Sequence, residues 1–402
     1  MDGLDASLVD EGFNDDPFPT YARLRAEDPV HWSDAWGVWV VTRYADIQAV
    51  IRDSATFSNA GRFAALVESL PPEEMWAADI VRRHNAVGML QSDPPDHTRL
   101  RGLIRQVFTP RVVEGLRPRV DALVARALDR VDPEGFDVIH DLAFRLPISV
   151  ILELLGLPEE DTDYVARLAD DVSSLQSTGR AVSANAHRAA TAIVEIEAYF
   201  DRVCRARRTA LGDDLISRMV SARLDDERLS DDEMINMCVN LLFAGHQTTE
   251  HLIGNAALLL LDHPDARQAL MSDPSLWDTA IEECLRFQSP IQRAWRRVAA
   301  PTSLHGRDLA AGQLVYLMLG SANRDPDVFP EPETFDIRRK PNRHLAFGYG
   351  IHFCIGAPLA RLEGPIALRH LFTRYPELEV VEPPARVKSI HLRGVDRLAV
   401  RA

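Results

Sequence analysis

The feature that most limits how this chain can fold is one long run of helix-compatible residues. It opens with Ser230-Asp231-Asp232-Glu233, which has the Ser-x-x-Glu form of a helix capping box, and continues to Asp262, just before His263-Pro264. Such a helix would be roughly 48 Å long, enough to cross a large domain. We therefore expect a mainly α-helical protein with this helix running through its centre.

The chain has no obvious internal boundary. Its 402 residues exceed the about 250–300 that one core usually serves, yet no Pro/Gly/Ser-rich linker or internal repeat divides it. We therefore expect one domain over residues 1–402. Runs of β-branched and aromatic residues predict a smaller β-containing lobe, mainly from residues 20–60 and 300–320 plus C-terminal strands. Residues 61–92 are weakly periodic and predict a functional loop.

Charge and hydropathy limit the partners. The formal net charge of −15 excludes general nucleic-acid binding, although residues 286–402 hold 18 Lys and Arg against 11 Asp and Glu. The N-terminus has no signal-peptide pattern, and the longest aliphatic run, Ala256 to Leu261, is too short to span a bilayer. We expect a cytoplasmic monomer that binds neither membrane nor nucleic acid.

One cysteine has an unusual setting. Cys204, Cys238, Cys284 and Cys354 are widely spaced, so no zinc site or disulfide framework is readable. Cys354 lies in FGYGIHFCIG, directly before a predicted helix start, where the helix dipole favours thiolate over thiol. From these residues alone it is a buried structural cysteine, a nucleophile, a redox sensor or a metal ligand.

The surrounding motif narrows this choice. Phe347-Gly348-x-Gly350-x-His352-x-Cys354-x-Gly356, followed by Leu359-Ala360-Arg361, resembles the haem-ligand signature of the bacterial cytochrome P450 family. The resemblance implies a P450-like fold with haem b buried between the long helix and the cysteine loop. It makes Cys354 the thiolate ligand of the haem iron, with Phe347, Gly348 and Gly356 around it.

Further family motifs occur in the expected order. Glu283-x-x-Arg286 matches the family's helix motif, and Arg339, with Arg338 as alternate, matches the arginine that this pair meets. The resemblance also implies contacts to the haem propionates from His97, Arg101, Arg297 and His352.

The middle of the long helix matches the family's oxygen-binding segment. Ala244 and Gly245 would leave room for O₂, and Thr248 would supply the catalytic hydroxyl. The alternative is a simple kink or close helix packing, since glycine and threonine are poor helix formers. Gln247 departs from the family pattern, where this position is usually acidic.

The implied function is that of an oxidoreductase. The resemblance predicts a monooxygenase that inserts one oxygen atom from O₂ into a hydrophobic small molecule, by hydroxylation or epoxidation, in secondary metabolism or catabolism. The expected substrate-pocket walls are Phe63, Val87, Met89, Leu242, Ile291, Gln292 and Ile390. Electrons would come from a ferredoxin and a ferredoxin reductase, with the acidic ferredoxin docking on Arg99, Arg105, Lys340, Arg343 and Arg361.

Two other readings remain open. Gln247 favours a haem-thiolate enzyme of the same fold that uses peroxide or nitric oxide, or an isomerase or dehydratase. The second is a non-catalytic haem-binding sensor.

Overall fold

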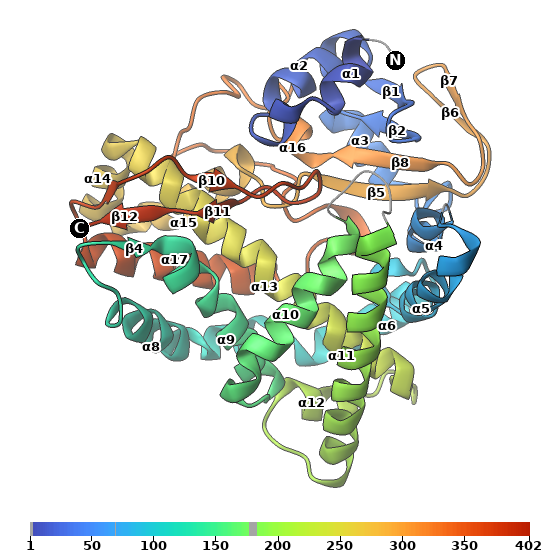
Figure 1. Cartoon of the computed structure of the whole chain (residues 1–402), viewed down its shortest axis with the longest axis horizontal. Helices are drawn as coiled ribbons and strands as arrows, with labels where there is room; N and C mark the ends of the chain where they lie inside the picture. The colour runs from blue at the N-terminus through green and yellow to red at the C-terminus, as the bar shows by residue number, and fades with distance from the viewer. Residues whose placement is uncertain (1–2, 69, 177–182) are drawn as a thin grey trace.

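Helices dominate the computed structural model, which describes residues 3–68, 70–176 and 183–402 (Figure 1). The α-helices are α1 (Gly3–Leu8), α2 (Phe18–Glu27), α3 (Tyr44–Arg52), α4 (Arg62–Val67), α5 (Met75–Ala86), α6 (Asp96–Val107), α7 (Pro110–Gly115), α8 (Arg117–Leu128), α9 (Arg145–Leu155), α10 (Thr162–Ser173), α11 (Ser183–Thr209), α12 (Leu215–Ser221), α13 (Asp231–Asp262), α14 (Pro264–Ser272), α15 (Trp277–Phe287), α16 (Leu319–Ala322) and α17 (Ala357–Arg374).

The strands of the described residues are short and form four sheets. They are β1 (Val30–Ser33), β2 (Val38–Val41), β3 (Phe57–Ser58), β4 (Phe136–Asp137), β5 (Arg293–Val298), β6 (Thr302–Leu304), β7 (Arg307–Leu309), β8 (Leu314–Met318), β9 (Glu379–Val380), β10 (Ala385–Arg386), β11 (Val395–Arg397) and β12 (Ala399–Arg401).

The smaller lobe is built on a five-stranded sheet of order β1-β2-β8-β5-β3. Only the β2–β8 pair is parallel, with Trp39 opposite Val315. Segments 20–60 and 300–320 both contribute strands to it. The C-terminal strands are not hydrogen-bonded into it: β12 pairs with β4 and β9, and β10 pairs with β11, although Leu392 forms an isolated bridge with Ile291 just before β5.

The predicted long helix is α13, and it begins and ends where the sequence indicates. The capping box is complete, because the Ser230 hydroxyl accepts from the Glu233 N–H at 3.2 Å and the Glu233 carboxylate accepts from the Ser230 N–H at 2.8 Å. The helix crosses the middle of the molecule (Figure 1). Its length therefore sets the span of the helical lobe.

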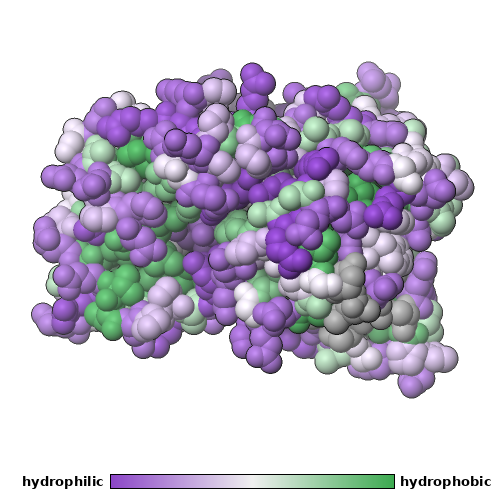
Figure 2. All heavy atoms as spheres, turned by 90° about the horizontal axis from the view of Figure 1, so that it is seen from above, coloured by the Kyte–Doolittle hydropathy of each residue, from purple (hydrophilic) through white to green (hydrophobic). Residues whose placement is uncertain are grey.

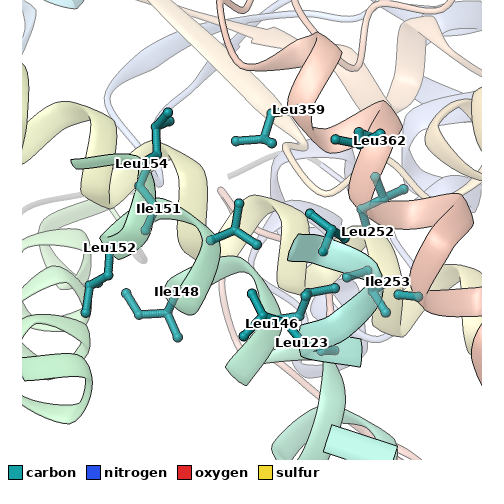
Figure 3. Packing of buried hydrophobic residues seen from close by; sticks show 14 of the residues in the cluster. Leu123, Leu146, Ile148, Ile151, Leu152, Leu154, Leu252, Ile253, Leu359 and Leu362 are labelled. Atoms are coloured by element: carbon teal, nitrogen blue, oxygen red, sulfur yellow. The ribbon is translucent and has the colours of Figure 1, made fainter. Parts of the chain in front are cut away.

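The main core surrounds α13. Figure 3 shows leucine and isoleucine side chains of α8, α9, α13 and α17 gathered in one cluster, among them Leu123, Ile151, Leu252 and Leu362. Each fully buried side chain of this kind stabilises the fold by about 1.5–3 kcal/mol. α17 continues as a helix through Pro365. The core fixes α13 and α17, which carry the two halves of the site described below.

Residues 61–92 are largely helical rather than the predicted loop. α5 buries Ala77, Ala78 and Val81, and its His84 Nδ1 lies 2.9 Å from a carboxylate oxygen of Glu197 on α11. A short helix whose buried face consists partly of small alanines gives little hydrophobic periodicity in the sequence. This explains why the pattern predicted a loop.

The face of the molecule seen in Figure 2 is mostly polar. Figure 2 shows one face on which hydrophilic residues predominate and apolar residues form separate patches. None of the described helices combines the length and the apolarity needed to cross a membrane.

Candidate active site

The cysteine loop is a tight turn that ends at the start of α17. Gly348 and Gly350 adopt φ values of +71° and +69°, a left-handed conformation that strains residues with a Cβ. The Cys354 N–H donates to the Phe347 carbonyl at 2.9 Å. The loop therefore holds Cys354 just before the first turn of α17, as the sequence predicts.

The electrostatics of Cys354 differ from the expectation. Burial raises the pKa of its thiol, and the backbone N–H groups of Gly356 and Ala357, with the charges of Arg101 and Arg361, only partly oppose this. The helix start alone therefore does not yield a thiolate. A bound metal ion would supply the missing positive charge, because a coordinating thiol is deprotonated.

A buried ion-pair network supports the segment that leads into this loop. Arg286 donates to both carboxylate oxygens of Glu283, at 2.8 and 2.7 Å, and both side chains are fully buried. The Arg339 Nε lies 3.2 Å from the same carboxylate, so the structure brings together the three residues that the motif groups. Asp336 and Asn342 also donate to Glu283, at 2.9 and 3.1 Å. Glu283 thus joins α15 to the chain entering the cysteine loop.

Basic and imidazole side chains converge beside the loop. The rings of His97 on α6 and His352 lie 4.1 Å apart, and Arg101 donates to the Phe353 carbonyl at 2.6 Å. Burial lowers the pKa of both histidines, that of His352 to about 2, so both are neutral at pH 7. Both ring nitrogens of His97 and the Nε2 of His352 are buried without a hydrogen-bond partner.

The structure corrects one residue of this cluster. Arg296, not Arg297, faces it: Arg296 is buried and its charge reaches His352. The Arg297 side chain lies over Gly61 and Gly312 instead. Both arginines belong to β5, and neighbouring residues of a strand point to opposite faces. The sequence motif does not indicate which of the two arginines points toward the cluster.

The centre of α13 presents two different faces. The Thr248 hydroxyl donates to the Ala244 carbonyl at 2.7 Å, and Ala244 is exposed although it lies mid-helix. Gly245 faces α9, where a Cβ would come within 3.3 Å of Ile151 Cδ1. Gly245 therefore serves close helix packing, and only Ala244 and Thr248 share the open face.

Gln247 has an acidic partner that the sequence did not reveal. Its amide donates to the Asp170 carboxylate on α10 at 2.7 Å. Both residues line a cavity of about 350 Å³ together with Phe243 and Glu250. Burial raises the pKa of Asp170 to about 6 and that of Glu250 to about 8. A carboxyl group thus lies next to position 247 although that residue is an amide.

The comparisons with known proteins decide the family. The sequence model of the cytochrome P450 family matches residues 175–390, more than half of the chain. The chain belongs to the cytochrome P450 family. It is 41% identical to the cytochrome P450 monooxygenase PikC of Streptomyces venezuelae over 99% of this chain and 94% of that protein. It is 38% identical to the 6-deoxyerythronolide B hydroxylase of Saccharopolyspora erythraea over 98% of each.

The solved structures agree. The cytochrome P450 PksS of the Bacillus subtilis bacillaene polyketide synthase superposes with a TM-score of 0.87 at 33% identity, over 100% of this chain and 99% of that one. The protein therefore has the P450 fold that the sequence predicts, and it is a monooxygenase whose family uses a haem with thiolate ligation.

The residues present fit such a haem. Unpartnered buried nitrogens on His97 and His352, beside the cations Arg101 and Arg296, match the two carboxylates that a haem carries. Cys354 lies on the same side of the molecule as this cluster, since Arg101 bonds to the residue before it. Cys354 would hold the iron of such a haem, and Thr248 on the open face of α13 would supply a hydroxyl.

None of the predicted pocket walls, all of which lie in the described residues, lines the cavity beside Gln247. Leu242 is fully buried in the main core, Phe63 packs edge-on against Trp295 at 5.4 Å, and the Gln292 amide bonds to the Ser289 carbonyl at 2.7 Å. Leu242 faces the core because it lies about 100° around the helix from Phe243, which does line the cavity. The half-buried residues Val87, Met89, Ile291 and Ile390 stay predictions.

The predicted docking cations also divide into two groups. Arg99 pairs with Glu233, and Arg361 bonds both oxygens of Glu282 at 2.7 Å. Arg105, Lys340 and Arg343 are exposed. Only this exposed group keeps its positive charge available to a partner.

Proposed function

We propose that this P450 uses haem b to insert one oxygen atom of O₂ into a large hydrophobic secondary metabolite, by hydroxylation or epoxidation. Two relatives of similar length at 38–41% identity are named as a monooxygenase and as a hydroxylase of 6-deoxyerythronolide B. The observation that carries the proposal is the placement of Cys354 just before α17 and beside a cluster of arginines and histidines in which both ring nitrogens of His97 and the Nε2 of His352 lack a hydrogen-bond partner.

Each residue then has a role. Cys354 would hold the haem iron, and His97, Arg101, Arg296 and His352 would hold its propionates. When bound, a haem with a thiolate ligand supplies the electron donation that favours O–O cleavage. The Thr248 hydroxyl would hold a proton or an ordered water at the Ala244 face.

The direct test is product formation. Purified enzyme with NADPH, ferredoxin, ferredoxin reductase and a panel of macrolactones and fatty acids should yield products heavier by one oxygen atom, labelled when ¹⁸O₂ is supplied. Turnover with hydrogen peroxide alone, without label from ¹⁸O₂, would instead support the peroxide-using alternative.

The electron donor is proposed to be an acidic ferredoxin that docks on Arg105, Lys340 and Arg343. Charge reversal by Arg105→Glu or Arg343→Glu should slow reduction of the enzyme by ferredoxin about tenfold at low salt and weaken its salt dependence. Stopped-flow reduction rates over a salt series check this. Arg23→Glu, at an exposed position on α2, is the control. Equal rates and salt slopes in all three variants would refute the docking surface.

Proton delivery is proposed to use Asp170. The reaction consumes two electrons and two protons, and an amide at position 247 cannot ionise. Asp170 is held by that amide, and with Glu250 it has a pKa close enough to neutrality to take up and release protons across the cavity. Gln247 would then position the acid rather than act as one.

Exchanging the carboxyl group of residue 170 and the amide of residue 247 tests this role. Asp170→Asn should lower the fraction of NADPH electrons recovered in product on the order of 100-fold, the low end for loss of a positioned acid. The double variant Asp170→Asn with Gln247→Glu keeps one acid and one amide and should recover most of the loss. Substrate affinity from spin-shift titration is the control. If Asp170→Asn alone kept the wild-type fraction of electrons recovered in product, Asp170 would not belong to the proton path.

A further inference from the structure

The cationic cluster contains one more arginine than the motifs predict. Arg62, the first residue of α4, is 8% exposed, and its charge reaches both Arg296 and His352. Five basic or imidazole groups therefore lie together: Arg62, His97 and Arg296 are buried, and Arg101 and His352 are half-buried. Like charges packed in low dielectric repel one another, so such a cluster is costly without an anion.

The hydrogen bonds of Arg62 do not compensate its charge. Its two terminal nitrogens donate to the carbonyls of Trp295 and Leu90, both at the long distance of 3.4 Å, and its Nε is buried without a partner. Among residues 3–68, 70–176 and 183–402, no carboxylate oxygen lies within 4.0 Å of its nitrogens. The guanidinium is also 5.4 and 5.6 Å from the rings of Phe63 and Trp295, which wall it in.

The acid whose charge acts on Arg62 is Asp93, and its carboxylate is already engaged. Asp93 accepts from the Ser58 hydroxyl and from the Asn59 N–H, the latter at 3.0 Å. Burial and Arg296 lower the pKa of Arg62 to about 9, so it stays a cation at neutral pH. A buried guanidinium with an unused N–H and no carboxylate partner is the donor arrangement that pairs with a carboxylate of a ligand.

We propose that Arg62 is a haem-positioning residue that pairs with one haem propionate from the α4 side, beside Arg296 and His352. The inference rests on the haem binding described under the proposed function. The two propionates would then have separate partners: His97 and Arg101 of α6 for one, and the arginines of α4 and β5 for the other. Arg62 would thereby connect the start of α4, which follows the left-handed Gly61, to the cofactor.

Two substitutions at Arg62 separate charge from packing. Arg62→Met keeps the length of the apolar stem and removes the charge, whereas Arg62→Lys keeps the charge and loses the planar fork. For Arg62→Met holoenzyme we expect haem transfer to apomyoglobin about 10- to 100-fold faster than for wild type, the range for loss of a charge-assisted hydrogen bond. Its reduction potential should fall, because loss of a nearby cation favours the ferric state. Arg62→Lys should keep the potential and show a smaller increase in haem release.

Arg25→Met is the matched control. Arg25 is also buried, on α2, and donates to the Ser321 carbonyl and hydroxyl at 3.0 and 2.9 Å. Loss of the Arg25 guanidinium should lower thermal stability and leave the reduction potential unchanged. Once the difference in stability is taken into account, haem release should also be unchanged.

Three outcomes would overturn the proposal. In the first, Arg62→Met releases haem no faster than Arg25→Met and keeps the wild-type potential. The second applies if Arg62→Met does not accumulate as a folded protein. In that case Arg62→Lys releases haem at the wild-type rate but has a lowered reduction potential. In the third, the Arg62 variants lose affinity only for a carboxylate-bearing fatty acid probe, which would assign Arg62 to substrate. Failure of the proposed function is distinct, since then the wild-type protein would lack a thiolate-ligated haem.

Discussion

Replacing Glu283 by glutamine is expected to lower the free energy of unfolding by about 3–5 kcal/mol, the usual cost of breaking a buried ion pair. The glutamine amide would leave Arg286 and Arg339 without a carboxylate, and Arg286 is fully buried. Denaturant unfolding of the holoprotein measures the change. Haem content should fall too, because Glu283 ties α15 to the Asp336–Asn342 segment that enters the cysteine loop.

A surface pair provides the comparison for this prediction. Glu27→Gln breaks the exposed pair with Arg23 in α2, where both side chains are about half exposed, and should cost only about 0.3–0.5 kcal/mol. If Glu283→Gln destabilised the protein no more than Glu27→Gln, the network would not support the loop.

Replacing Cys354 by serine is expected to reduce monooxygenase turnover on the order of 100-fold or more, because the electron-donating thiolate is lost. Serine keeps the size of the side chain and leaves the turn from Phe347 intact, so the fold should persist. Product formation per haem, with ferredoxin and NADPH, is the measurement. Cys204→Ala, a buried cysteine of α11, should leave turnover unchanged.

Equal turnover per haem in Cys354→Ser and wild type would contradict the assignment of the iron ligand. Loss of turnover in Cys204→Ala would point to a general effect of removing a buried cysteine.

Local sequence patterns were sufficient to predict a feature wherever all the residues that determine it lie in one short segment. The capping box and apolar length of α13, the glycine turn before Cys354 and the spacing of Glu283 and Arg286 are each fixed by neighbours in sequence. These features were therefore predictable. The family resemblance then added Arg339, which is distant in sequence but part of the same motif set.

The remaining features depend on tertiary packing. Arg296 and Arg297 differ only in which face of β5 they occupy, and that face is set by pairing with β8. Asp170 is 77 residues from Gln247, and no motif marks it or Arg62. In the sequence, Gly245 indicated space for a ligand. In the structure it packs closely against Ile151, a contact that depends on the position of α9.

The central claim, that Cys354 binds haem iron as a thiolate, is tested most directly by the absorbance of the reduced, CO-bound protein. The wild-type protein should show a Soret band at the red-shifted position specific to thiolate ligation, and Cys354→Ser should lack it. A band at the position typical of histidine or neutral thiol ligation, or a purified protein that binds no haem, would contradict the claim.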